Sequence, residues 1–254
     1  MGLSSMAASV TNKRIDAQDR LIVALDLETL AEAKSMVESL DGLVYTFKIG
    51  LTLQLAEGAE GFIRWLIKNR NKVFLDYKYF DIPQTIETAV RRAAELGVSF
   101  LTVHGNRGIN EAAVRGRGQS DLKILSVTVL TSLDEPDIRA LGFQGSVEEL
   151  VLRRVRMAVE TGCDGVITSG QEAAAVRQAV HPGFLIVTPG IRPDGTSIDD
   201  QKRIVTPSQA IASGADYLVL GRPILTPKDG KDPLTAAAEI LKEMQTAFDR
   251  QNNA

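Results

Sequence analysis

Short runs of β-branched and aliphatic residues alternate with longer segments of helical period along this chain, beginning at residue 21. A short apolar run bounded by turn residues is typical of a buried strand, and an apolar period of three to four residues is typical of an amphipathic helix. The pattern predicts strands at Leu21–Asp26, Tyr45–Ile49, Lys72–Lys78, Phe100–His104, Leu122–Val129, Gly165–Ser169, Phe184–Thr188 and Tyr217–Gly221. It predicts helices at Leu30–Leu40, Ala59–Asn69, Ile82–Leu96, Glu111–Arg117, Val147–Thr161, Gln171–Val180, Pro207–Ala212 and Leu234–Arg250.

The order of these elements gives about eight strand-then-helix units, which is what a (β/α)8 TIM barrel requires. Gly97, Gly162 and Gly214 stand where a helix must end before the next strand begins. No linker rich in Pro, Gly or Ser divides the chain, so we expect a single α/β domain over residues 21–250. A doubly wound open sheet shows a similar alternation, so the period favours the barrel without excluding the open sheet.

Composition narrows the class of protein and its partners. The first twenty residues contain no apolar run long enough for a signal sequence, and we expect a disordered extension over residues 1–20. No segment approaches the ~18 apolar residues of a membrane span. A net charge of −3 offers no overall positive field that would gather nucleic acid or an anionic membrane, although it leaves room for local basic sites that bind small phosphorylated ligands. The single cysteine, Cys163, can form no internal disulfide, so a cytoplasmic, reducing compartment fits best.

Ionisable residues stand at the ends of the first three predicted strands. Asp26 closes the run LIVALD, Lys48 lies at the end of VYTFKIG, and Asp76, Lys78 and Asp81 follow one another in DYKYFD. Catalytic side chains of a TIM barrel come from the carboxyl ends of its strands. Residues i and i+2 of a strand share a face, so we expect Asp76 and Lys78 to point together into the upper rim of the barrel as a close ion pair.

Each of these residues also has a structural interpretation. Asp81 precedes Pro83 and can cap the following helix, and Asp76 with Lys78 can be an ordinary ion pair. Burying several charges together is costly, however, unless function or close pairing retains them. We therefore interpret the cluster as a functional site in which Asp26 and Lys48 extend an alternating array of charges.

The last two predicted strands carry candidate phosphate ligands. Barrels often bind phosphate with the loops after strands seven and eight, using backbone N–H groups and a short helix terminus. Arg192 and Arg222 supply guanidinium donors in these loops, Gly221 allows close approach of the backbone, and Gln201 can donate through its amide. Either arginine could instead be a solvated surface residue. The presence of one arginine in each of the two predicted loops favours a phosphate-binding site.

The string DYKYFDIPQT resembles the motif D-x-K-x-x-D-I-P-x-T of the orotidine 5′-monophosphate decarboxylase family in its bacterial form. VALD, FKIG, TVHG, VLTS, TPGIRP, DDQKRIVTP and LVLGRPI also resemble family segments, in family order. The resemblance runs from Leu21 to about residue 245. It implies a TIM-barrel carboxy-lyase that converts orotidine 5′-monophosphate (OMP) to UMP and CO2 in pyrimidine biosynthesis, with no cofactor and no metal.

Carried over residue by residue, the resemblance implies that Lys78 protonates C6 of the pyrimidine while Asp76 faces the departing carboxylate. Lys48 and Asp81 would complete the charge array. Asp26 and Lys48 would hold ribose hydroxyls, and Thr131 would read the edge of the pyrimidine.

The resemblance also implies a homodimer. Asp81, Ile82 and Thr85 would be presented to the active site of the neighbouring subunit, so complete sites would require two chains. The sequence departs from the family pattern at Phe80 and Gln84, where many members carry His and Asn, and at residues 105–118. We expect changed packing rather than lost chemistry at the first two positions and assign no role to residues 105–118.

Two other functions stay open. Keto-gulonate phosphate decarboxylases and hexulose phosphate synthases resemble the D-x-K-x-x-D strand but use Mg²⁺, whereas Lys48, the I-P-x-T continuation and Gln201 favour the nucleotide enzyme. A non-catalytic barrel that senses a nucleotide is the second alternative. With only two histidines, His104 and His181, and no acidic pair suitably near either, we do not expect a resident metal centre.

Overall fold

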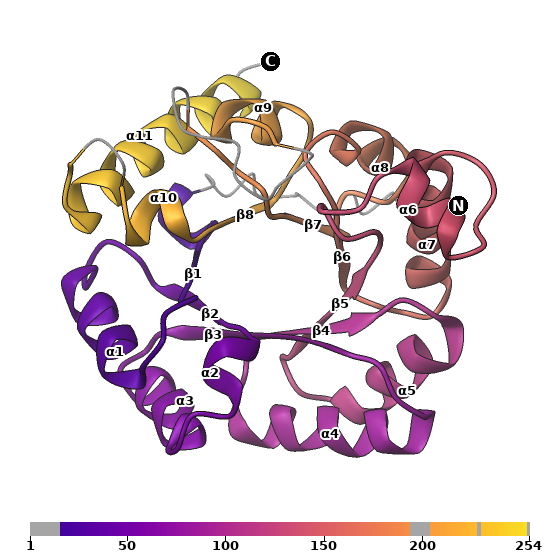
Figure 1. Ribbon diagram of the computed structural model, residues 1–254, viewed down its shortest axis with the longest axis horizontal. Helices are drawn as coiled ribbons and strands as arrows, with labels where there is room; N and C mark the ends of the chain where they lie inside the picture. The colour runs from indigo at the N-terminus through magenta and orange to yellow at the C-terminus, as the bar shows by residue number, and fades with distance from the viewer. Residues whose placement is uncertain (1–15, 194–203, 228–229, 253–254) are drawn as a thin grey trace, which may run out of the picture.

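The computed structural model describes residues 16–193, 204–227 and 230–252, which form a closed barrel of parallel strands inside a ring of helices (Figure 1). Each strand pairs with the next along the chain, and the eighth pairs with the first. This closure confirms the predicted TIM barrel and excludes the open sheet. The strands are β1 (Leu21–Ala24), β2 (Thr46–Ile49), β3 (Lys72–Tyr79), β4 (Phe100–His104), β5 (Lys123–Val127), β6 (Gly165–Ile167), β7 (Leu185–Thr188) and β8 (Tyr217–Leu220).

The helices cover the outside of the barrel, and all eight predicted helices are present, α9 with the predicted bounds and the others with one or both ends shifted. Three additional helices, α2, α6 and α10, were not predicted; α2 and α10 have four residues each, which is too short to show a helical period. The helices are α1 (Leu30–Ser39), α2 (Leu51–Gln54), α3 (Ala59–Lys68), α4 (Pro83–Leu96), α5 (Arg107–Arg117), α6 (Glu135–Ala140), α7 (Val147–Glu160), α8 (Ala173–Ala179), α9 (Pro207–Ala212), α10 (Arg222–Leu225) and α11 (Pro233–Asn252).

Local signals in the sequence fix where several helices begin and end. Thr29 and Glu32 form a reciprocal capping box at the start of α1, and Ser146 and Glu149 do the same at α7, which satisfies backbone N–H groups that lack helical partners. At the end of α4, Gly97 adopts a left-handed conformation with φ of 88°, which glycine enters without steric cost.

Two separate layers of apolar side chains hold the barrel together. One lies between the strands and the surrounding helices, and the other contains strand residues alone and therefore fills the interior of the barrel. The residues of this inner layer alternate along the strands with those of the outer layer, as the two-residue period of a strand requires. The inner layer consists of Ile22, Ala24, Phe74, Phe100, Leu125, Val187 and Val219.

The folded part of the chain begins before the predicted domain boundary. Residues 1–15 of the expected extension lie outside the described residues, but Ala17–Asp19 form a short 3-10 helix. The side chain of Ala17 is buried, and its backbone N–H donates to Gln245 Oε1 of α11 at 3.0 Å. The expectation of disorder up to residue 20 is therefore wrong for residues 16–20.

Two further features concern the cysteine and the length of the helices. Cys163 is buried, and burial raises the pKa of its thiol to about 12, which agrees with a structural rather than a nucleophilic role. Among the helices of the described residues, none combines the length and the apolar character needed to cross a bilayer.

An ion pair ties α8 to the last two strands at their amino ends. Asp216, directly before β8, accepts hydrogen bonds from Arg177 of α8 at 2.5 Å and from the backbone N–H of Ile186 at 2.8 Å. Arg177 also donates to the carbonyls of Gly214 and Phe184. Burial raises the pKa of Asp216 despite these contacts, so the carboxylate depends on Arg177 for stabilisation.

Replacing Arg177 by methionine is expected to destabilise the fold by about 3 kcal/mol, because a largely buried carboxylate loses its counter-ion and two carbonyls lose their donor. Urea unfolding of the variant and the wild type measures this difference. Arg64→Met is the matched control: Arg64 also forms a short ion pair, with Glu60, but both side chains are more than half exposed. Its cost is expected to stay below about 1 kcal/mol. Equal losses in the two variants would contradict this assignment.

Candidate active site

Four charged side chains meet at the carboxyl ends of β1, β2 and β3 and alternate in sign. Lys48 Nζ lies 3.1 Å from Asp26 Oδ1 and 3.5 Å from Asp76 Oδ2. Lys78 Nζ lies 2.9 Å from Asp76 Oδ1. The predicted convergence of Asp26, Lys48, Asp76 and Lys78 is thus present, and we call these four residues the charge array.

The inner layer of the barrel explains why these side chains converge. Asp26, Lys48 and Asp76 each stand two residues beyond an inward-facing strand residue, namely Ala24, Thr46 and Phe74. In a closed parallel barrel all strands end at the same rim, so continuation of the inward face brings the three side chains together above the apolar interior.

Burial deepens toward the middle of the array. The side chain of Lys48 is 9% exposed and that of Asp76 is 14% exposed, whereas the values for Lys78 and Asp26 are 33% and 52%. Burial by itself would raise the pKa of Asp76, but the ammonium groups of Lys48 and Lys78 and a hydrogen bond from Thr102 outweigh it and hold the pKa below its ordinary value of 3.8. Asp76 is therefore ionised at neutral pH.

The backbone of β3 leaves regular geometry where it carries Lys78. The pairing of β3 with β4 shifts register between Leu75 and Tyr79, and Lys78 has a φ of 48°. A non-glycine residue in this region is uncommon and strained, and such residues cluster at functional sites. The predicted pairing of Asp76 with Lys78 is confirmed, but a bulged strand rather than simple alternation produces it.

Sequence reasoning missed Thr102 on β4. Its hydroxyl donates to Asp76 Oδ1 at 2.9 Å and accepts from the backbone N–H of Lys78 at 2.9 Å. A signal was available, because Thr102 stands two residues beyond Phe100 of the inner layer, at the level of the array.

Two glycines allow the backbone to approach the array closely. A Cβ on Gly50 would lie 3.1 Å from both Asp26 Oδ1 and Lys48 Nζ, which is tighter than ordinary contact. A Cβ on Gly221 would lie 3.6 Å from Asp26 Oδ2, so the end of β8 borders the array. Gly221, a predicted binding residue, is therefore next to the charged groups.

The other predicted binding residues follow later strands at the same rim. Thr131 is buried in the turn after β5, and Arg222 begins α10, separated from β8 by Gly221 alone. Arg192 follows β7 and is 8% exposed, with its guanidinium donating to the carbonyl of Ile191 at 2.9 Å. Gln201 lies outside the described residues.

Asp81, Ile82 and Thr85 are exposed on the outside of this subunit and do not join the array. In the described part of the chain, no ion pair links Asp81 to Lys48 or Lys78. The N-cap of α4 is Ile82, without a side-chain bond, and Asp81 accepts from the backbone N–H of Ile82 at 2.6 Å. The helix-capping interpretation of Asp81 is therefore wrong.

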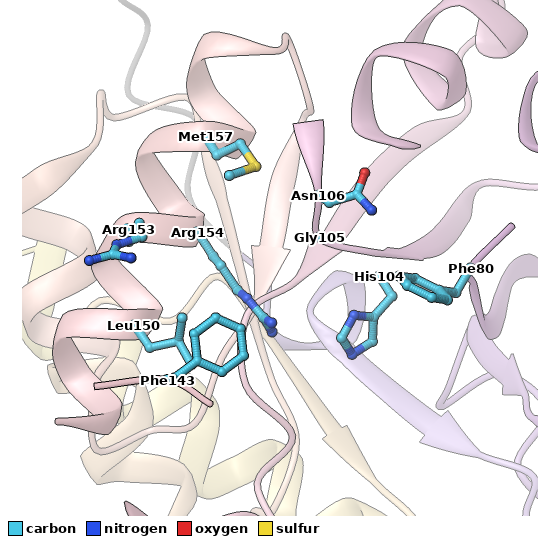
Figure 2. A pocket seen from close by; sticks show the side chains of 9 residues that line it. All are labelled: Phe80, His104, Gly105, Asn106, Phe143, Leu150, Arg153, Arg154 and Met157. Carbon is cyan, nitrogen blue, oxygen red and sulfur yellow. The ribbon is translucent and has the colours of Figure 1, made fainter. Parts of the chain in front are cut away.

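A separate cavity of about 580 Å³ opens beside the end of β4, between β4 and α7 (Figure 2). His104 lies on one side of it with its ring edge-on to Phe80 at 5.7 Å, and Arg154 reaches in from α7 over the ring of Phe143. Burial and then the nearby Arg154 and Lys78 charges lower the pKa of His104. No member of the charge array lines this cavity.

Within the described residues, no group of three or more His, Cys, Asp or Glu side chains is arranged to hold a metal ion. The carboxylates of Asp26 and Asp76 share the Lys48 ammonium instead.

Comparison of the sequence with known proteins identifies the family of the chain. Residues 19–240 match the model of the orotidine 5′-phosphate decarboxylase / HUMPS family. The chain belongs to this family. The match covers most of the barrel and includes every residue of the charge array.

Individual proteins of this family are similar to this chain over almost their whole length. Proteins named orotidine 5′-phosphate decarboxylase from Nitrobacter winogradskyi and Methylococcus capsulatus are 52% and 47% identical, over 91% and 94% of this chain and 95% and 97% of theirs. The crystal structure of orotidine 5′-phosphate decarboxylase from Lactobacillus acidophilus superposes with a TM-score of 0.75 at 32% identity, covering 89% of this chain and 98% of that one. The resemblance, the fold and the carboxy-lyase class predicted from the sequence are confirmed.

The buried middle of the array makes a prediction about pH. A carboxyl group whose pKa is lower in the folded than in the unfolded state stabilises the fold at any pH above its unfolded-state pKa. This stabilisation is lost as the pH falls through the folded-state pKa. Lys48→Met removes the main opposing charge of Asp76, so the pKa of Asp76 should rise. We expect the acid-unfolding midpoint, followed by circular dichroism, to move to higher pH, and stability at pH 7 to fall by about 3 kcal/mol.

Lys34→Met is the control for this variant, because Lys34 also pairs with an acid, Glu38, but on the exposed face of α1. Its midpoint should stay close to that of the wild type. A lower or unchanged midpoint in Lys48→Met would contradict the electrostatic role of Lys48.

Proposed function

We propose that the protein decarboxylates OMP to UMP and CO2 without a cofactor, in the cytoplasm, as a step of pyrimidine biosynthesis. The names of its relatives support this substrate. The observation that carries the proposal is the charge array itself: a lysine ammonium, Lys78, held 2.9 Å from an ionised aspartate at the rim of the barrel.

The reaction requires both a positive charge and a proton at one point. When the bond between C6 and the carboxylate breaks, its electron pair stays on C6 and CO2 departs, leaving a carbanion with poor delocalisation. The Lys78 ammonium stabilises that developing charge and then transfers a proton from Nζ to C6. The neutral amine regains a proton from solvent, which it can reach because a third of the side chain is exposed.

Asp76 and Lys48 have different tasks in this scheme. Asp76 orients the Lys78 ammonium and disfavours the negative carboxylate of the substrate relative to the transition state, in which that charge has moved toward C6. Lys48 balances the charge of Asp76 and, with the more exposed Asp26, offers polar groups for the ribose hydroxyls.

The later strands supply the remaining contacts to the nucleotide. Arg192 and Arg222, with Gln201, would bind the phosphate at the loops after β7 and β8, where a guanidinium gives paired hydrogen bonds to phosphate oxygens. Thr131, after β5, would contact the edge of the pyrimidine. The position of Gly221 beside Asp26 supports a nucleotide that spans from β8 to the array.

The magnesium-dependent alternative is disfavoured by Lys48. The matched family description includes HUMPS members, so the family alone does not decide between a nucleotide and a sugar phosphate. A divalent ion bound between Asp26 and Asp76 would have to displace the Lys48 ammonium, which already lies within 3.5 Å of both carboxylates. The relatives at 47–52% identity carry the nucleotide enzyme's name.

The decisive assay follows the fall in absorbance of OMP in excess EDTA. We expect undiminished decarboxylation, and a loss of about 10²–10⁴-fold in kcat for Lys78→Ala, which lacks the proton donor. Activity that disappears with EDTA and returns with Mg²⁺ would favour the sugar-phosphate enzymes. Tight UMP binding without turnover would favour a nucleotide sensor.

We also propose that the active enzyme is a homodimer in which Asp81, Ile82 and Thr85 reach the neighbouring site. Phe80 and Ile82, on either side of Asp81, are 69% and 66% exposed, an unfavourable arrangement for large apolar side chains in an isolated subunit. Burial of this segment against a second copy would cover the apolar groups and carry the Asp81 carboxylate to the other array.

Mixed dimers test the subunit origin of Asp81. Lys78→Ala and Asp81→Asn are each expected to be nearly inactive alone. If Asp81 acts across the interface, subunit exchange gives hybrids in which one site carries both changes and the other carries neither, so the mixture recovers up to about a quarter of wild-type activity.

Lys78→Ala mixed with Lys48→Met is the control, because both residues belong to the array of one chain and every hybrid site then carries one defect. This mixture should stay inactive. Absence of recovery with Asp81→Asn, in a mixture shown by mass to exchange subunits, would sink the proposal for Asp81.

A further inference from the structure

Thr102 of β4 stands opposite an irregular stretch of β3. Leu75 pairs with Leu101 and Tyr79 pairs with Val103, so three residues of β3 oppose one residue of β4, Thr102. Insertion of extra residues leaves part of the ladder unpaired and redirects side chains. The three residues of β3 between these pairs are Asp76, Tyr77 and Lys78, two of which belong to the charge array.

The Thr102 side chain takes over the hydrogen bonding that the ladder lacks at this point. Its hydroxyl oxygen accepts from the backbone N–H of Lys78 at 2.9 Å, and its hydroxyl proton is donated to Asp76 Oδ1 at 2.9 Å. The same carboxylate oxygen accepts from Lys78 Nζ at 2.9 Å. Thr102 itself is fully buried, so its hydroxyl is withdrawn from solvent.

The contacts restrain a strained piece of backbone. Lys78 has a φ of 48°, a conformation that a non-glycine residue keeps only where its surroundings enforce it. The hydrogen bond from the Lys78 N–H to the Thr102 hydroxyl restrains the backbone of Lys78. The hydrogen bond from Nζ to Asp76 restrains the end of its side chain. One hydroxyl thus connects the backbone of one charged residue to the side chain of the other.

We propose that Thr102 is a positioning residue for the decarboxylation. Its hydroxyl holds the Asp76 carboxylate and the Lys78 ammonium in the relative positions that the reaction requires. The proposal rests on the function proposed above. It assigns Thr102 no contact with the substrate, so loss of the hydroxyl should affect the chemical step and leave nucleotide binding nearly intact.

Three variants isolate the hydroxyl. Thr102→Val has nearly the same shape without the hydroxyl, and Thr102→Ser restores the hydroxyl on a smaller side chain. Thr46→Val is the matched control, because Thr46 of β2 is equally buried and its hydroxyl has no hydrogen-bond partner among the described residues. If Thr102→Val does not fold, as judged by circular dichroism, Thr102→Ala replaces it.

Steady-state kinetics with OMP and titration with UMP measure the two expected effects. We expect kcat of Thr102→Val to fall about 10- to 100-fold with the UMP dissociation constant changed by less than about threefold. Thr102→Ser should recover most of the lost kcat, and Thr46→Val should match the wild type. An unchanged kcat in Thr102→Val, or no recovery in Thr102→Ser, would overturn the proposal.

Hydrogen exchange at the Lys78 amide tests the contact without reference to catalysis. Loss of its acceptor in Thr102→Val should speed exchange, and Thr102→Ser should restore protection. Unchanged exchange would show that the contact itself is absent and would overturn the proposal. A wild-type protein that fails to decarboxylate OMP would instead refute the proposed function, with the exchange result still reporting on the contact.

Discussion

The site depends on one buried carboxylate, Asp76, placed between two ammonium groups. Asp76 is 14% exposed, and its ionised form persists because Lys48 and Lys78, at 3.5 and 2.9 Å, together with the hydrogen bond from Thr102, outweigh the cost of desolvation. Removal of either lysine leaves Asp76 with one counter-ion in place of two, and removal of Asp76 leaves the two ammonium groups without the carboxylate between them. The array is therefore a coupled unit, in which a change to one member alters the surroundings of the others.

The barrel holds these charged groups together without burying all of them in its apolar interior. Its interior is filled by apolar side chains from six of the eight strands, and the charged groups lie above this layer, where one end of the array opens to solvent. Closure of the sheet brings β8 back to β1, so the glycine that follows β8 lies beside Asp26. Residues from the first and last units of the chain consequently share one rim.

Much of this arrangement could be predicted from the sequence. Asp26, Lys48 and Asp76 stand at the ends of apolar runs, and the two-residue period of a strand is enough to direct them inward. Closure of the barrel does not follow from the sequence pattern, because an open sheet has the same local pattern and only the pairing of β1 with β8 separates the two. The short helix α10 could not be predicted, because four residues are too few to show a helical period of apolar residues.

The bulge in β3 could not be predicted, since it depends on a partner 24 residues away in the sequence. Regular alternation leads to the correct pairing of Asp76 with Lys78, but it gives no indication of the bulge that produces the pairing, of the positive φ of Lys78 or of the hydroxyl of Thr102. Side-chain hydrogen bonds across strands follow register, and register is a property of the assembled sheet. The same limit applies to the exposed segment around Asp81, whose sequence suits a helix cap equally well.

Two lysines of identical chemistry occupy different surroundings in the array, and the difference assigns their roles. Lys48 is almost fully buried and lies near two carboxylates, Asp26 and Asp76, which hold its ammonium in place. Lys78 is paired with one carboxylate and is one-third exposed, so its ammonium can turn toward a ligand and exchange protons with solvent. Environment separates paired ionisable groups into a fixed charge and a proton donor, as it does in other active sites. On this ground we propose that Lys78, rather than Lys48, meets the carbanion.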